Sequence, residues 1–173
     1  ADFNKAIELA PESDAGYFER GETELAQNQY EPALADLNKA IELNSNNPDA
    51  YYRRGLTQYH LEKFPEAIQD YTTAIEKNPN ELNAYNRRAD VYVTMNQFEK
   101  AQPDLEAALR LKPDDAATIQ RLQFVKNKIA ESNRPAPVQS TPTPPPPPPA
   151  AVHQASLLTP LNIGIGVAVL VVL

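Results

Sequence analysis

Apolar side chains recur through residues 1–131 at the three- and four-residue spacing that places them on one face of an α-helix. Two successive series fall at Tyr51, Gly55 and Tyr59, and at Ala67, Tyr71, Ala74 and Ile75. Residue types that begin helices stand at Ser13, Asn47-Pro48 and Asp114. The pattern therefore predicts short amphipathic helices in pairs, with turns near residues 28–29, 62–63 and 96–97.

The same pattern returns after 34 residues, without a gap. One half of the unit appears at Asp2–Leu9, Asp36–Leu43, Asp70–Lys77 and Asp104–Leu111. The other half appears at Gly16–Gly21, Ala50–Gly55 and Ala84–Ala89. Two short helices cannot bury both of their faces alone, so repeated pairs are expected to stack and share one continuous core.

The spacing and the residues resemble the tetratricopeptide repeat, a helix–turn–helix unit of 34 residues. The resemblance covers residues 1–131 and implies an all-α fold, a right-handed superhelix of stacked antiparallel helix pairs. Its small packing positions correspond to Gly21, Gly55 and Ala89, and its first-helix aromatic anchor to Tyr17, Tyr51 and Tyr85. The expected units are the second helix of a preceding repeat at 1–10, repeats at 14–47, 48–81 and 82–115, and a capping helix at 115–131.

Two features lie at the ends of this array. The capping helix carries one apolar stripe, made of Ala116, Ile119, Leu122, Val125 and Ile129. At the other end, the helix at residues 1–10 would expose a face meant for a partner helix. We therefore expect the natural protein to extend further in the N-terminal direction.

Charged residues repeat with the same spacing. Arg20, Arg54 and Arg88 occupy one position of the unit, and Asp36, Asp70 and Asp104 occupy another, sixteen residues later. Because antiparallel helices joined by a short turn bring these positions to facing levels, we expect each Arg to pair with an Asp. The alternative is an arginine ladder that binds an acidic ligand. Arg53 and Arg87 have no repeated partner and are expected to face solvent.

The resemblance also implies a binding surface, because first helices line the concave face in this family, where peptides or single helices of partner proteins lie. The positions carried over are Phe18, Glu22, Leu25, Asp49, Tyr52, Leu56, Tyr59, His60, Asn83, Asn86, Asp90 and Val93. A surface that is aromatic at its centre and acidic at its edge suits a partner with basic and apolar character. The two-charge clamp that some members use for chaperone C-termini is missing, since Phe18, Glu22, Leu56, Asn86 and Asp90 occupy its places. Alternatively, Tyr52 and Tyr59 only pack between helices.

Composition and charge argue against several other functions. The chain has no Cys and two His, which excludes thiolate metal sites and argues against a multi-histidine site. Its net charge of −7 argues against nucleic-acid binding, which depends on neutralising phosphates. We expect no catalysis, no cofactor, no metal and no small-molecule substrate. His60 stands alone and suits a surface or groove position better than a catalytic one.

The composition changes after residue 131. Residues 132–156 are rich in Pro, including the run Pro144–Pro149, and predict a disordered linker. Residues 157–173 are almost wholly apolar and predict one transmembrane helix that the chain's end interrupts. We therefore expect a non-catalytic adaptor anchored by a single pass, with its repeats in the cytoplasm. The alternatives are a recruiting segment of a larger enzyme, and a soluble scaffold whose tail docks on a partner.

Overall fold

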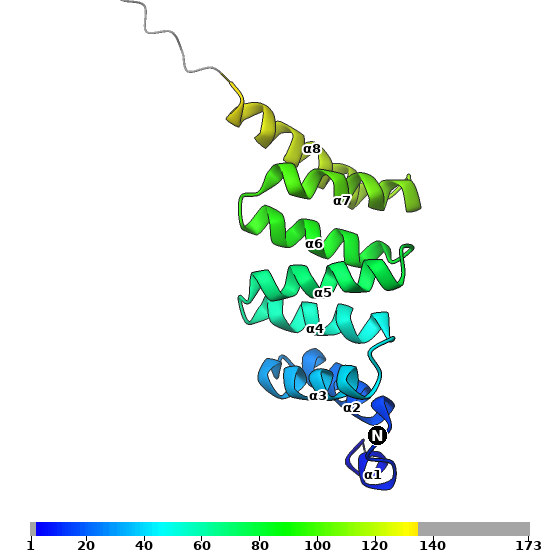
Figure 1. Cartoon of the computed structure of the whole chain (residues 1–173). Helices are drawn as coiled ribbons and strands as arrows, with labels where there is room; N and C mark the ends of the chain where they lie inside the picture. The colour runs from blue at the N-terminus through cyan, green and yellow to red at the C-terminus, as the bar shows by residue number, and fades with distance from the viewer. Residues whose placement is uncertain (1–2, 135–173) are drawn as a thin grey trace, which may run out of the picture. The chain divides into compact units, whose positions relative to one another are not determined.

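The computed structural model describes residues 3–134 of the chain, which form eight α-helices (Figure 1). They are α1 (Phe3–Leu9), α2 (Asp14–Ala26), α3 (Tyr30–Leu43), α4 (Pro48–His60), α5 (Phe64–Lys77), α6 (Leu82–Thr94), α7 (Phe98–Leu111) and α8 (Ala116–Ser132). No strand occurs in residues 3–134, so the predicted all-α fold is confirmed for this part of the chain. Nearly all of the predicted linker and the whole apolar tail lie outside the described residues.

The helices pack as consecutive pairs that stack on one another (Figure 1). Helix α2 packs against α3, α4 against α5, and α6 against α7, while α8 packs on α7. The pairs also contact their neighbours, through α3 with α4 and α5 with α6. The described residues therefore form a solenoid of helix pairs. Among them, no helix combines the length and the apolar character that a membrane crossing needs.

The turn inside each pair uses a left-handed residue that is not glycine. Asn28, Glu62 and Asn96 have φ angles of 60°, 58° and 56°. The following backbone N–H, as in Lys63, donates to the carbonyl oxygen five residues earlier, in this case Gln58, at 2.9 Å. These are the bonds of a Schellman motif, which ends a helix and usually contains glycine at the left-handed position. Asn accepts this conformation readily, whereas Glu62 adopts it at a cost in conformational energy.

Side-chain caps fix the starts of three helices, α4, α6 and α8. Asn47 Oδ1 accepts hydrogen bonds from the backbone N–H groups of Asp49 at 3.0 Å and Ala50 at 3.4 Å. The cap of α8 is Asp115, whose carboxylate accepts from the Thr118 N–H at 3.0 Å. The prediction of a start at Asp114 was therefore wrong by one residue, because two adjacent Asp residues offer the same capping chemistry. Ser13 occupies the N-cap position of α2 without a side-chain cap bond.

Small residues bring the two helices of each pair together. Ala33, Ala67 and Ala101 in the second helices are completely buried. A Cβ atom added to Gly55 would lie 2.9 Å from Cε1 of Tyr71, closer than real Cβ contacts come. Tyr71 is completely buried, and its hydroxyl group has no hydrogen-bond partner. The large ring of Tyr71 therefore requires a glycine opposite it, whereas Leu105 shares its buried cluster with Ala89.

Each repeated arginine joins three helices. Arg54 donates from Nε and Nη2 to the two carboxylate oxygens of Asp70, both at 2.7 Å, and from Nη1 to Asn38 Oδ1 at 2.9 Å. Its guanidinium in α4 thus binds α5 of its own pair and α3 of the preceding pair. The Asp70 side chain is only 4% exposed, so its charge depends on this arginine.

The same arrangement recurs in the other two pairs. Arg20 binds Asp36 at 2.5 and 2.7 Å and Asn4 at 2.7 Å. Arg88 binds Asp104 at 2.8 and 2.6 Å and donates to Thr72 Oγ1 at 2.8 Å. We call each such group an arginine staple. Because all five donors of a guanidinium are fixed in one plane, the three staples hold successive repeats in one register.

Helix α8 ends the repeated pattern. Val125 is completely buried, and Leu122 and Ile129 pack against the cluster of Ala89, Ala101 and Leu105. The predicted stripe was wrong at its first two members, because Ala116 is exposed and Ile119 is 46% exposed. Thr118 is buried in their place, and its backbone N–H and its hydroxyl group both donate to the carboxylate of Asp115. At the register positions of Arg88 and Ala89, α8 has Leu122 and Gln123, so it carries no staple arginine and no small packing residue.

Helix α1 is the least covered element. None of its residues is buried, and Leu9 is 75% exposed. It packs on α2, where Ile7 lies against Gly16. Its Phe3 and Ala6 occupy the register positions of Leu37 and Ala40, which are buried in the next second helix. The positions that form the core elsewhere are therefore only partly used in α1.

We expect loss of a staple to be costly. The Arg54→Ala variant should lower the free energy of unfolding by about 2–4 kcal/mol, because Asp70 would remain buried without its partner. The Arg54→Ala/Asp70→Ala double variant should lose less than the sum of the single changes. Urea unfolding followed by circular dichroism measures these values. Lys39→Ala, which removes an exposed ion pair with Glu42, should leave the free energy of unfolding almost unchanged. If Lys39→Ala and Arg54→Ala lowered the free energy of unfolding equally, the staple would have no special role.

The fit of Gly55 against Tyr71 leads to a second expectation. Gly55→Ala should destabilise the protein by about 1–2 kcal/mol, because the overpacking outweighs the gain in helix propensity of about 1 kcal/mol. In the Tyr71→Leu background the same change should be close to neutral, since Ala then faces Leu as in the third pair. A thermal or urea double-mutant cycle measures the coupling. If Gly55→Ala lowered the free energy of unfolding equally in both backgrounds, the Tyr71 ring would not be what excludes a larger residue at position 55.

Candidate functional site

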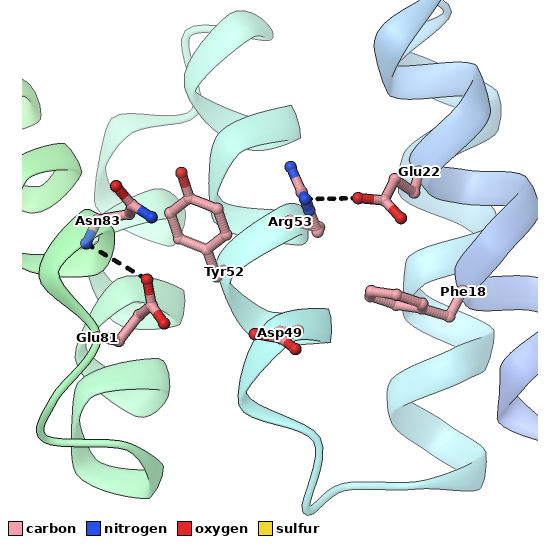
Figure 2. A pocket seen from close by; sticks show the side chains of 7 residues that line it. All are labelled: Phe18, Glu22, Asp49, Tyr52, Arg53, Glu81 and Asn83. Carbon is pink, nitrogen blue, oxygen red and sulfur yellow. Dashed lines mark hydrogen bonds and ion pairs between the residues drawn. The ribbon is translucent and has the colours of Figure 1, made fainter.

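A pocket of about 290 Å³ lies on the first helices of the three pairs (Figure 2). Its lining comes from α2, α4 and α6 and the residue before α6: Phe18, Glu22, Asp49, Tyr52, Arg53, Glu81 and Asn83. Five of these residues belong to the predicted concave face, and Arg53 and Glu81 do not. We call this surface the groove pocket.

Helical spacing explains why these side chains share one surface. Phe18 and Glu22 lie one turn apart on α2, and Asp49, Tyr52 and Arg53 lie within about one turn on α4. Glu81 is the N-cap of α6, and its Oε1 accepts a hydrogen bond from the Asn83 N–H at 3.3 Å. The pocket is therefore built on rigid helices and on one capped helix start.

Arg53 is held inside the pocket. Its Nη2 lies 2.5 Å from Glu22 Oε1, and its guanidinium lies 5.6 Å from the centre of the Tyr52 ring (Figure 2). Arg53 was expected to face solvent, but it is half-buried, because the adjacent repeat presents Glu22 beside it. The pair connects α2 with α4 across the pocket. About a third of each of the two side chains remains exposed, so solvent screens this pair.

The pocket carries excess negative charge. It contains three carboxylates, from Glu22, Asp49 and Glu81, and one guanidinium, from Arg53. Within residues 3–134, the structure gives an ion pair to Glu22 but none to Asp49 or Glu81. Phe18 and Tyr52 add half-buried aromatic surface. This combination suits a ligand that brings both positive charge and apolar surface.

Several residues of the predicted concave face serve packing instead. Leu25 is 8% exposed and belongs to the core. Tyr59 packs against the buried cluster of Ala67, Tyr71 and Val91, and Val93 packs against the next cluster. Leu56 is half-buried outside the lining of the pocket. Tyr52 does both, since it lines the pocket and also packs against Tyr71 with ring centres 5.9 Å apart.

His60 lies at the end of α4 and is exposed. Its ring stacks on Tyr30 with centres 4.8 Å apart and planes 7° apart, and Tyr59 contacts its edge. This aromatic contact joins α3 to α4 and gives His60 a packing role. In the described part of the chain, no group of three His, Asp or Glu side chains is placed to hold a metal ion.

Helix α8 occupies the third-repeat part of the predicted surface. Asn86 Oδ1 accepts a hydrogen bond from Thr118 Oγ1 at 2.9 Å. Asp90 lies 3.5 Å from Arg121 and 3.6 Å from Arg87, and Arg87 is exposed, as expected. Burial raises the pKa of Asp90, and the charges of Arg121 and Arg87 oppose that shift. Asn86 and Asp90 of the predicted surface therefore contact α8, whereas Asn83 of the same repeat lines the pocket.

Comparisons with known proteins agree with this fold. A family model described as TPR repeat matches residues 21–62, and two described as tetratricopeptide repeat match residues 48–81 and 82–115. No curated protein sequence matches significantly.

Many solved structures are similar to the chain. The first TPR of Spaghetti (RPAP3), bound to the HSP90 peptide SRMEEVD, has a TM-score of 0.66 and 24% identity, over 68% of this chain and 94% of that one. YrrB, described as a TPR protein with an unusual peptide-binding site, has a TM-score of 0.68 and 26% identity, over 77% of this chain and 67% of that one. The Arabidopsis OM64 TPR domain has a TM-score of 0.64 and 25% identity, over 67% of this chain and 96% of that one.

Proposed function

Because the chain belongs to the tetratricopeptide repeat family, we propose that it is a non-catalytic adaptor that binds a peptide or helix of a partner protein in the groove pocket. The observation that carries this proposal is the pocket itself, which gathers aromatic, acidic and amide side chains from three repeats. Such a surface offers a polypeptide both contact area and hydrogen bonds. One similar structure is described as bound to an HSP90 peptide and another as a TPR protein with an unusual peptide-binding site, which supports the same use here.

The arrangement of the pocket favours a polypeptide over other ligands. Its lining comes from α2 on one side and α6 on the other, with α4 between them (Figure 2). The chain's net charge of −7 opposes binding to nucleic acid. We propose no catalytic role, no cofactor and no small-molecule substrate, in keeping with the usual use of this fold.

The second part of the proposal is a membrane anchor formed by residues 157–173. Leu161–Leu173 contains no charged residue and consists mainly of Leu, Val and Ile with Gly and Ala. Side chains of this kind favour the hydrocarbon of a bilayer over water. The Pro-rich residues 132–156 would separate the repeats from the bilayer surface, and we propose that the repeats face the cytoplasm.

Crosslinking from chosen positions tests the groove. A photoreactive benzoylphenylalanine replaces Phe18 or Asn83 in the full chain, and replaces Glu66 of α5 or Glu99 of α7 as matched exposed controls. We expect a partner protein to crosslink from the two groove positions at least fivefold more than from the controls. Circular dichroism checks that all four variants fold. Crosslinks that form only from Glu66 or Glu99 would place binding on the second helices and contradict the proposal.

Flotation with phosphatidylcholine vesicles tests the anchor. The full chain should float with the vesicles, and the Val167→Lys/Leu170→Lys variant should not. Each central lysine costs about 2.5–3.5 kcal/mol of insertion free energy. The Lys126→Ala/Lys128→Ala variant also changes the net charge by two units, but in α8, and should float normally. If the full chain stays in solution, or if the two variants behave alike, residues 157–173 do not anchor the protein.

A further inference from the structure

The arginines of the groove are already engaged. Arg53 binds Glu22 at 2.5 Å, and Arg87 and Arg121 both lie beside Asp90. Asp49 and Glu81 differ from these acids, because no basic side chain of residues 3–134 forms an ion pair with either. Both line the same pocket, one from the first turn of α4 and the other from the cap of α6. The pocket therefore presents two carboxylates whose charge is not balanced within the described residues.

Aromatic surface lies next to these carboxylates. Figure 2 shows Asp49 and Glu81 below the ring of Tyr52 in the view, with the Arg53–Glu22 pair to its right. The ring of Phe18 extends from α2 toward α4 (Figure 2). Tyr52 already accepts one cation on its ring, since the Arg53 guanidinium lies 5.6 Å from its centre. Long basic side chains suit such a place, because their methylene stem packs on apolar surface while their charged end reaches an acid.

We propose that the groove pocket selects its partner through a Lys or Arg side chain that enters between Asp49 and Glu81, with a neighbouring apolar side chain packed on Phe18. This inference rests on the proposed function and adds the chemistry that the groove recognises. The ammonium or guanidinium group donates hydrogen bonds to the two carboxylates. The pocket volume of about 290 Å³ leaves room for a long side chain beside the aromatic rings.

An acidic ligand fits the same pocket poorly. The only guanidinium that lines it is Arg53, and Arg53 is already bound to Glu22. An incoming carboxylate would have to displace Glu22 and would also meet the charges of Asp49 and Glu81. Like charges brought together in this way oppose binding. Charge complementarity therefore favours a basic segment over an acidic one.

Selection from a displayed library of random twelve-residue peptides tests this inference on the full chain. We expect the selected peptides to contain Lys or Arg next to Leu, Ile, Phe or Tyr. A representative peptide is then synthesised and titrated by fluorescence anisotropy. Its affinity should fall about fivefold to tenfold for Asp49→Asn/Glu81→Gln. It should also fall about fivefold between 0.05 and 0.5 M NaCl, because salt screens exposed charges.

Matched variants separate the pocket from the general charge of the protein. Glu66→Gln/Glu99→Gln removes two exposed carboxylates outside the pocket and should leave the affinity within twofold of the wild-type value. Equal losses for the two double variants would overturn the inference, because the net charge alone would then explain binding. Selected peptides without basic residues, or acidic peptides that depend on Arg53, would also overturn it while leaving the proposed function intact. If no peptide is selected and no partner crosslinks from Phe18 or Asn83, the proposed function itself fails.

Discussion

The arginine staple is the interaction on which the arrangement of this solenoid depends. Each guanidinium neutralises an aspartate that is nearly buried, so neither member of the pair is stable at its position without the other. The remaining donor reaches back to Asn4, Asn38 or Thr72 of the preceding pair. A single side chain therefore sets two distances at once, one within a repeat and one between repeats. Apolar burial supplies most of the stabilisation, but it has no direction, and the staples supply the register.

The staple also determines which residues form the groove. Neighbouring residues on an α-helix are 100° apart, so side chains two positions before or after an arginine point to the opposite face. Phe18 and Glu22 stand in this relation to Arg20, and Tyr52 does to Arg54. Turning the arginine toward the second helix therefore turns these residues toward the pocket. Structural and binding positions alternate along each first helix, so a rotation of the helix would displace both sets together.

The sequence was sufficient for the features that repeat. The 34-residue spacing indicated the helix pairs. The match between three repeated Arg positions and three repeated Asp positions, sixteen residues later, indicated which charges face each other. It was insufficient where a contact occurs only once. The ion pairs of Arg53 and Arg87 were missed because nothing in the repetition shows that Glu22 and Asp90 lie beside them. Glu81 was missed because Glu is an unusual N-cap residue, although it stands 34 residues after the cap Asn47. Asn86 and Asp90 depend on α8, whose departure from the repeat hides its contacts from pattern reasoning.

The loss of the pattern in α8 has a consequence for how such a gene can change. A duplication of 34 codons within the array would copy an arginine, its aspartate and the small packing residue together, so the new unit would fit both neighbours. A unit placed directly after α8 would meet Leu122 and Gln123 instead of Arg and Gly or Ala. Helix α8 would offer this unit neither a staple arginine nor a small residue at the close-packing position. New repeats can therefore be inserted within the array more easily than directly after α8.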